Sequence, residues 1–212
     1  VTGDTKVVDK GKGDGVFINT AGIGVVPSGV TIGPQRVLPG DAILVSGDLG
    51  CHGVAVLSVR ENLSFTADIT SDSAPLHRVV ADIIADGIEI HCLRDLTRVG
   101  LASALNEMAA AAGVRLAIDE QAIPIRDEVQ GACEVLGLDP LYVANEGRFV
   151  AFVPEAQADR AVAVMRRHAV AREAARVGKV DGCESSIVVL KTVLGTHRIL
   201  DLLSGEQLPR IC

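Results

Sequence analysis

The sequence predicts a mixed α/β domain over about residues 40–203, and two observations support this fold class. The 212-residue chain is 48% hydrophobic, with no Trp, one Tyr and four Phe. It can therefore bury a sizeable core built from Val, Ile, Leu and Ala. Strand-like apolar segments also alternate with segments whose apolar residues recur at helical spacing. Helices and strands are therefore expected to share one aliphatic core.

Residues 1–38 are expected to contain strand and loop but no helix. Val1–Val8 and Val16–Thr20 have the composition of short strands and flank a glycine-rich turn at 10–15. Two strands cannot build a core by themselves, and the chain opens on Val1, almost inside a strand. We therefore expect this segment to be the end of a preceding domain, with the true N-terminus upstream.

The pattern changes at Asp41, where the elements of the α/β domain begin. Residues 42–46 predict a buried strand, and a glycine-rich loop then leads through Cys51 into a helix over 54–61. A second helix is predicted over 75–85, where Gly87 follows its last turn. Further helices are expected over 99–112, 126–136 and 155–168, and further strands over 114–118, 149–153, 174–180, 186–191 and 197–202.

Residues 204–212 are predicted to form a flexible tail. A Ser-Gly pair opens the segment, Pro209 cannot continue a sheet ladder, and the chain stops on the thiol of Cys212. A tail of this kind can carry its terminal thiol into a distant pocket. The alternative is a frayed end that happens to finish in cysteine.

The composition argues against several classes of function. A net charge of −7 disfavours a general surface for nucleic acid or anionic membranes. The five cysteines are widely spaced and form no CxxC pair, so neither a disulfide framework nor a zinc ribbon is indicated. No apolar run reaches membrane-spanning length. The simplest interpretation is a cytoplasmic protein with reduced thiols that binds neither nucleic acid nor membrane.

Two glycine-containing stretches are candidates for binding an anion or a metal. In Gly3–Lys6, Asp4 is an oxygen ligand suited to Mg²⁺ and Lys6 is a charge suited to phosphate, although a solvated turn explains the same residues. In Ser46–Gly53, glycines between strand and helix can bring backbone N–H groups together around an anion, and tight packing is the alternative. His52 in this stretch is either catalytic or a capping or packing residue.

Two further stretches carry residues suited to catalysis or phosphate binding. Asp95 or Thr97 is placed to cap the helix that follows, and the arginines around them add a possible phosphate contact at its positive end. Glu146 stands between Asn145 and a glycine at the start of a predicted strand, where a carboxylate can act as a general base. A surface turn is the alternative for this last stretch.

Taken together, the motifs resemble those of a known family. In chain order they are GDTKVV, FINTAGIG, PGDAILVSGDLGCHGVA, DLTRVGLASALNE, ANEGRFVA and a terminal PRIC. The series resembles the carbamoyl dehydratase family of hydrogenase maturation proteins, HypE, over essentially all 212 residues. The terminal PRIC is the most specific of these motifs. The family lies in the superfamily of aminoimidazole ribonucleotide synthetase, selenophosphate synthetase and thiamine monophosphate kinase.

This resemblance implies a domain plan. Family members have an ATP-binding N-terminal domain, through which they dimerise, and a PurM-like C-terminal α/β domain. Here it implies a remnant of the first domain over 1–38, a PurM-like domain over 39–203 and the tail 204–212. The acidic metal ligands that precede GDTK in the family are absent from this sequence. The chain as given is therefore expected to bind ATP poorly and to be inactive alone.

The resemblance also implies a reaction. In the family, HypF places a carbamoyl group on the terminal cysteine, here Cys212. The tail then enters the active site, ATP phosphorylates the carbamoyl oxygen, a base removes protons from nitrogen, and phosphate leaves a thiocyanate. The cyanide passes through HypC and HypD to the iron of [NiFe] hydrogenase.

Site roles follow from the motif matches. The ANEG match makes Glu146 the candidate base, with Asn145 orienting the substrate. The GDTK match implies that Asp4, Thr5 and Lys6 contact Mg²⁺ and the phosphates of ATP. The remaining candidates are expected to line the cleft: His52, Asp95 and Thr97.

Two other functions remain open at this point. Another ATP-dependent synthetase or kinase of the same superfamily would act on a free small molecule and would not need Cys212. A non-catalytic lobe that docks maturation partners would keep its function when Glu146 is changed to Gln.

Overall fold

A computed structural model of the chain describes residues 22–63, 68–98, 100–182 and 185–202. By its contacts the chain divides into two units, residues 1–30 and 31–212. In the first unit the described residues are 22–30, which include a turn closed by the Val30 N–H to the Pro27 carbonyl at 3.2 Å. The predicted strands in 1–20 and the predicted tail over 204–212 lie outside the described residues.

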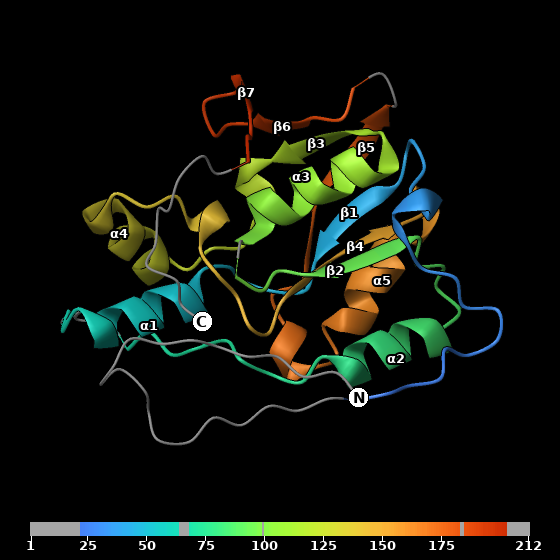
Figure 1. Cartoon of the computed structure of the whole chain (residues 1–212), viewed down its shortest axis with the longest axis horizontal. Coiled ribbons are helices and arrows are strands. Elements are labelled where there is room, and N and C mark those ends of the chain that lie inside the picture. Colours follow the sequence, from blue (N-terminus) through green and yellow to red (C-terminus); the bar gives the residue numbers. More distant parts are fainter. Residues whose placement is uncertain (1–21, 64–67, 99, 183–184, 203–212) are drawn as a thin grey trace, which may run out of the picture. The chain divides into compact units, whose positions relative to one another are not determined.

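The second unit is built on one sheet, which has seven strands in the described part of the chain (Figure 1). Neighbouring strands are antiparallel, except that β3 and β6 pair in parallel. In sheet order the strands are β2 (Cys92–Asp95), β4 (Phe149–Val153), β1 (Ala42–Val45), β5 (Ala175–Gly182), β3 (Arg115–Asp119), β6 (Val188–Lys191) and β7 (His197–Ile199).

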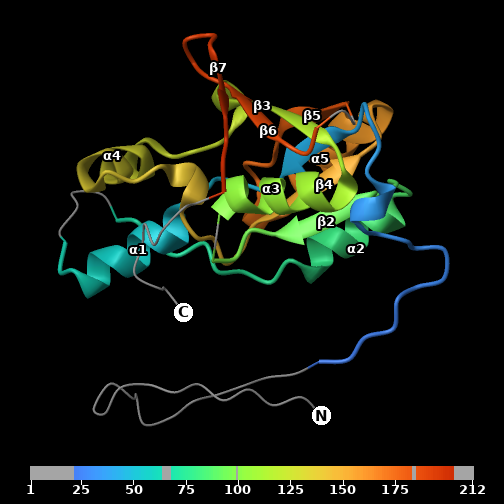
Figure 2. The same cartoon turned by 45° about the horizontal axis from the view of Figure 1, so that its top comes forward.

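The helices pack around this sheet in three groups (Figures 1 and 2). α3 (Gly100–Ala112) covers one face, and α2 (His77–Ala85) with α5 (Ala158–Met165) covers part of the other. α1 (Cys51–Arg60) and α4 (Asp127–Leu136) pack on each other to one side of the sheet.

The central strands divide their side chains between two apolar layers because successive side chains point to opposite faces. On β4, Val150 and Phe152 join the layer under α3, whereas Phe149, Ala151 and Val153 join the layer under α2 and α5. All five residues of this strand are buried. The aliphatic core predicted from the composition is confirmed.

Most predicted elements are present within a few residues of their predicted bounds, and three differ. β2 was not predicted: two of its four residues are charged, and it lies at the sheet edge. The helix predicted over 155–168 is a 3₁₀ turn at Glu155–Gln157 followed by α5, which ends at Met165. β7 stops at Ile199 because Leu200 turns into the core under α3.

Residues 31–38, which the sequence assigned to the preceding domain, make contacts within the second unit. The Gly33 N–H donates to the His91 carbonyl at 2.9 Å, and Arg36 pairs with Glu89 at 2.6 Å. Val37 is buried in the layer under α3. By these contacts, residues 31–38 belong to the α/β unit. The start of the PurM-like domain at residue 39 remains a prediction.

Candidate active site where three loops cross

Three loops meet beside one end of the sheet. Val45, the last residue of β1, pairs with Val150 near the start of β4, so the loop leaving β1 and the loop entering β4 emerge side by side. The third loop, 71–74, lies against both of them through hydrogen bonds to Glu146 and His52. We call this meeting point of residues 46–53, 71–74 and 143–148 the loop crossing.

Glycines let these loops approach more closely than side chains allow. A Cβ on Gly147 would lie 2.0 Å from the carbonyl oxygen of Asp72, and one on Gly53 would lie 2.3 Å from the side chain of Val143. Real Cβ atoms do not come this close, so only the missing side chain makes the packing possible. Close packing therefore accounts for Gly53, and anion binding by Ser46–Gly53 remains a prediction.

Asn145 fixes the geometry of the loop crossing. Its side chain is fully buried, accepts a hydrogen bond from the Gly50 N–H at 2.8 Å and donates to the Val143 carbonyl at 3.0 Å. Gly50 has a left-handed backbone and immediately precedes α1. Asn145 therefore joins the start of α1 to the loop that carries Glu146, and substrate contact by this side chain remains a prediction.

A buried ion pair lies under the crossing. Arg148 donates through Nε to the Asp48 carbonyl at 2.7 Å, through Nη1 to the Gly147 carbonyl at 2.9 Å, and through Nη2 to the Asp48 carboxylate. Arg126 adds a second contact to this carboxylate at 3.0 Å. Burial raises the pKa of Asp48. The hydrogen bond from Cys51 and the contacts with the two guanidinium groups outweigh this effect and lower the pKa overall. Asp48 is therefore a charged carboxylate with a structural role, and Arg148 and Arg126 balance its charge.

Cys51 is a protonated thiol within this network. It is the first residue of α1, donates to Asp48 at 3.1 Å and accepts from Arg126 at 2.8 Å. Burial, with help from Asp48, raises its pKa to about 11 although Arg126 acts in the opposite direction. Thiolates rather than thiols are nucleophiles, so Cys51 is not a nucleophile at neutral pH.

His52 holds the third loop in place. Its Nδ1 lies 2.9 Å from the Ser71 hydroxyl, which also accepts from the Ser73 N–H at 3.1 Å. The observed contact of His52 is thus with the protein, and its place in the lining of a substrate cleft remains a prediction.

Glu146 and Asp72 are the two carboxylates of the crossing that lack cationic partners among the described residues. The Glu146 N–H donates to Asp72 Oδ1 at 2.8 Å. Asp72 is only 9% exposed. Its other oxygen and Glu146 Oε1 are buried, and neither has a hydrogen-bond partner in the part of the chain that the structure describes. Buried carboxylate oxygens without donors are costly and point to a functional role.

Asp95 and Thr97 flank the crossing rather than enter it. Between them, the Leu96 N–H donates to the Arg148 carbonyl at 3.0 Å, which places this segment beside the entry to β4. Burial raises the pKa of Asp95, but the hydrogen bond from Thr97 and the charge of Arg94 lower it overall. Arg94 also pairs with Glu107 on α3 at 3.0 Å. A phosphate contact by Arg94 would therefore compete with its existing ion pairs.

Sequence reasoning missed several residues of the crossing, and some of the predicted ones lie outside the described residues. Asp48, Asp72, Arg126 and Arg148 were not singled out. Asp48 and Arg148 lie inside motifs that were, whereas Asp72 stands in an aperiodic Ser- and Asp-containing stretch. Asp4, Thr5, Lys6 and Cys212 fall outside the described ranges. Within those ranges, no group of three or more His, Cys, Asp or Glu side chains is placed to hold a metal ion.

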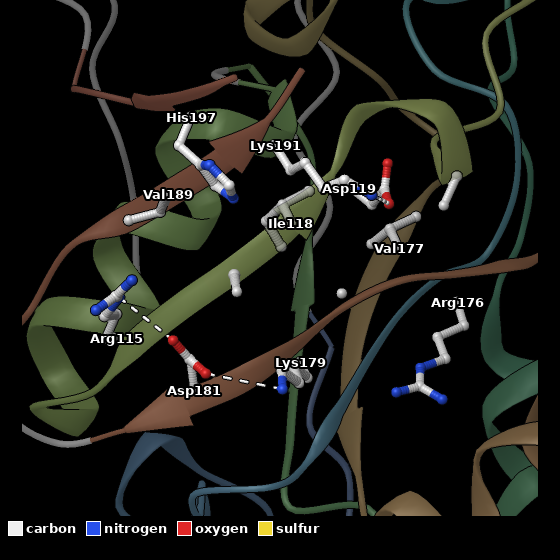
Figure 3. A pocket seen from close by; sticks show the side chains of 13 residues that line it. Arg115, Ile118, Asp119, Arg176, Val177, Lys179, Asp181, Val189, Lys191 and His197 are labelled. Carbon is white, nitrogen blue, oxygen red and sulfur yellow. Dashed lines mark hydrogen bonds and ion pairs between the residues drawn. The ribbon is translucent and has the colours of Figure 1, made fainter. Parts of the chain in front are cut away.

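A larger hollow lies elsewhere, on the face of β5, β3 and β6 that α2 and α5 leave open (Figure 3). Its volume is about 430 Å³, compared with about 250 Å³ for the cavity beside Asp48 and Asp72. Its carboxylates are paired: Asp119 with Lys191 at 3.0 Å, and Asp181 with Arg115 at 3.5 Å. We call it the sheet-face hollow. None of the predicted site residues that the structure describes lines it, so the loop crossing is the better candidate for catalysis.

Residues 39–191 match the family model described as AIR synthase related protein, C-terminal domain. The chain belongs to this family. This match confirms the PurM-like α/β fold that the sequence predicted for the unit described above. No described helix of this family member is long and apolar enough to cross a membrane.

Relatives within the family include carbamoyl dehydratases. The chain is 55% identical over 212 residues to carbamoyl dehydratase HypE of Azotobacter vinelandii, covering all of this chain and 62% of that protein. A crystal structure of hydrogenase maturation protein HypE in complex with ATP is 46% identical, with a TM-score of 0.81, and the match covers 85% of this chain and 55% of that one. A HypE–HypF complex is 38% identical, with a TM-score of 0.77, covering 81% and 56%. The predicted resemblance to HypE is confirmed.

The chain spans about 62% of the length of the curated relative from Azotobacter vinelandii. A thiamine-monophosphate kinase from Stenotrophomonas maltophilia is 20% identical, with a TM-score of 0.58, and covers 78% of this chain and 54% of its own. That likeness concerns the fold alone.

Proposed function

We propose that this chain forms the C-terminal catalytic lobe of a carbamoyl dehydratase. The reaction is the ATP-dependent dehydration of a carbamoyl group on its own Cys212 to a thiocyanate, which supplies cyanide ligands for [NiFe] hydrogenase. The observation that carries the proposal is Glu146: its buried Oε1 lacks a donor among the described residues, and it precedes Gly147, where the loops are too close for a side chain. The name of the 55%-identical relative supports the reaction class.

The chemistry needs a positioned base. The oxygen of a carbamoyl group is a poor leaving group, and phosphorylation by ATP converts it into a good one. The N–H bonds become acidic enough for a carboxylate only as that oxygen is phosphorylated. Glu146 takes a proton from nitrogen, and its loop is held in place by Asn145 and by the Arg148–Asp48 pair.

ATP is a substrate of this reaction, and Mg²⁺ would neutralise its phosphates. Asp4 would hold the metal, with Thr5 and Lys6 on the phosphates. A solved HypE relative contains ATP, which supports nucleotide use. We expect the 212-residue chain alone to bind ATP poorly and to be inactive.

The partners follow from the reaction. HypF would load the carbamoyl group, a role supported by the solved HypE–HypF complex of a relative. HypC and HypD would receive the cyanide and pass it to iron. We propose a homodimer for the intact protein.

The test uses the intact protein that carries this sequence, carbamoylated on Cys212. After addition of ATP, mass spectrometry of the C-terminal peptide should find the loss of one water for each ADP formed. Removal of Ile211 and Cys212 should abolish ATP turnover. ATP turnover on a soluble substrate after this removal would instead favour a small-molecule kinase, and full activity of Glu146→Gln would favour a docking lobe.

A further inference from the structure

Converting a carbamoyl group to a thiocyanate removes two protons from one nitrogen. In the first step the N–H bond breaks, nitrogen forms a double bond to carbon, and the carbonyl oxygen attacks the γ-phosphorus of ATP to release ADP. In the second step the other N–H bond breaks, its electrons form the third carbon–nitrogen bond, and the C–O bond breaks to release phosphate. While Glu146 holds the proton from the first step it cannot accept the second, so the second step calls for another acceptor.

We propose that Asp72 is a second catalytic carboxylate, which accepts the proton removed as phosphate leaves. This inference rests on the function proposed above, and it assigns a role to a residue that lies outside the motifs identified in the sequence. The two carboxylates belong to one structural unit, because Asp72 Oδ1 accepts the N–H of Glu146 at 2.8 Å.

The state of its two oxygens distinguishes Asp72 from a purely structural aspartate. Oδ1 is engaged by the backbone of Glu146, whereas Oδ2 is buried and has no partner among the described residues. Glu146 Oε1 has the same status. Asp72 also lines the cavity of about 250 Å³ beside the crossing, whose lining does not include Glu146. One Asp72 oxygen therefore fixes its position, and the other is a buried acceptor without a donor among the described residues.

The other ionisable groups of the crossing are already committed. Asp48 is held by Arg148 and Arg126 and accepts from the Cys51 thiol. The three Arg148 nitrogens donate to protein oxygens. His52 Nδ1 contacts the Ser71 hydroxyl. Among the described carboxylates of the crossing, Asp72 and Glu146 are the two without a cationic partner, which makes them its candidate proton acceptors.

The backbone keeps the two carboxylates in register. The carbonyl oxygen of Asp72 lies where a Cβ of residue 147 would be, at 2.0 Å from that position. Neither loop can therefore shift toward the other, so packing fixes the spacing of the two backbone segments that carry the acceptors.

Two substitutions separate proton transfer from positioning. Asp72→Asn keeps an oxygen that accepts the Glu146 N–H but removes the proton acceptor, whereas Asp72→Ala removes both. The experiment measures ADP release and thiocyanate on Cys212 in the intact carbamoylated protein, together with amide hydrogen exchange at Glu146.

For Asp72→Asn we expect ADP release to continue while thiocyanate formation falls on the order of 10²–10⁴-fold, the usual range for a lost acid–base group. Exchange protection at Glu146 should be retained in this variant and lost in Asp72→Ala. Glu146→Gln should lower ADP release and thiocyanate together, because it blocks the first step.

Thiocyanate formation by Asp72→Asn at the wild-type rate would overturn the inference and leave Asp72 as a positioning residue. An equal loss of ADP and thiocyanate in Asp72→Asn, with exchange protection retained, would also overturn it. Failure of the wild-type protein to form any thiocyanate would instead refute the proposed function itself, so the two failures are distinguishable.

Discussion

The loop crossing and the sheet-face hollow both gather carboxylates and guanidinium groups, but they surround them differently. At the crossing, Arg148 and Asp48 have side chains that are 9% and 12% exposed. In the hollow, Lys191 and Asp119 are 50% and 38% exposed. Charges kept from water interact strongly and are costly to leave unpaired, whereas exposed pairs are screened. The charges of the smaller site are therefore held more strongly by their partners than those of the hollow.

The largest difference should appear when one cation is removed from each site. Arg148→Ala leaves Asp48 buried with a weaker set of partners, and we expect it to lower the free energy of unfolding by about 3–5 kcal/mol. Lys191→Ala is the matched control, with an expected loss of about 0–1 kcal/mol. Urea denaturation of both variants measures these values. Equal effects would remove the contrast between the two sites.

A side chain added to a glycine should come next in size. Gly147→Ala places a methyl group 2.0 Å from the Asp72 carbonyl oxygen, and we expect a loss of about 3 kcal/mol because backbone has to move. Gly182→Ala, at the end of β5, meets no atom within 4 Å and should change stability by about 0.5 kcal/mol or less. Thermal unfolding compares the two, and tolerance of Gly147→Ala would show that the crossing is not tightly packed.

Burial at the crossing should also be visible in thiol chemistry. The pKa of Cys51 rises from 9.0 to about 11, so its thiolate fraction near pH 8 should be about 100-fold below that of an ordinary cysteine. Timed alkylation with iodoacetamide, read by peptide mass spectrometry, measures the rate. Cys133, buried in α4 with its pKa also raised to about 11, is the control. Alkylation of Cys51 much faster than Cys133 would mean that Arg126 outweighs burial.

The smallest expected effect is a pH dependence. The pKa of Asp48 in the folded protein is lowered below 3.8, so its contribution to stability is fully present above that value. The contribution is lost as the pH falls from 3.8 through the lowered folded pKa. Asp48→Asn should lose less stability than the wild type on acidification over this window. Asp119→Asn in the hollow should differ from the wild type less, and less still at high salt, because Asp119 is exposed.

Local pattern was sufficient for the elements with a strong period. The strand at 149–153 and the helices α2 and α4 were predicted closely, because a continuous apolar run or apolar residues at helical spacing show directly which side chains face the core. β2 was not, because its charged residues are stabilised by pairing with β4 and not by their own preference. The end of α5 depended on how the following residues pack, which its amphipathic pattern does not encode.

By itself the sequence determined the fold class, the aliphatic core and the candidate base, because each depends on composition, period or a contiguous motif such as ANEG around Glu146. Only the tertiary structure decided that Asp72, 74 positions away, shares a hydrogen bond with that residue. It also decided that Arg148 is committed to Asp48, across 100 positions. Contacts of this range are set by how the sheet brings its loops together, and no local pattern carries that information.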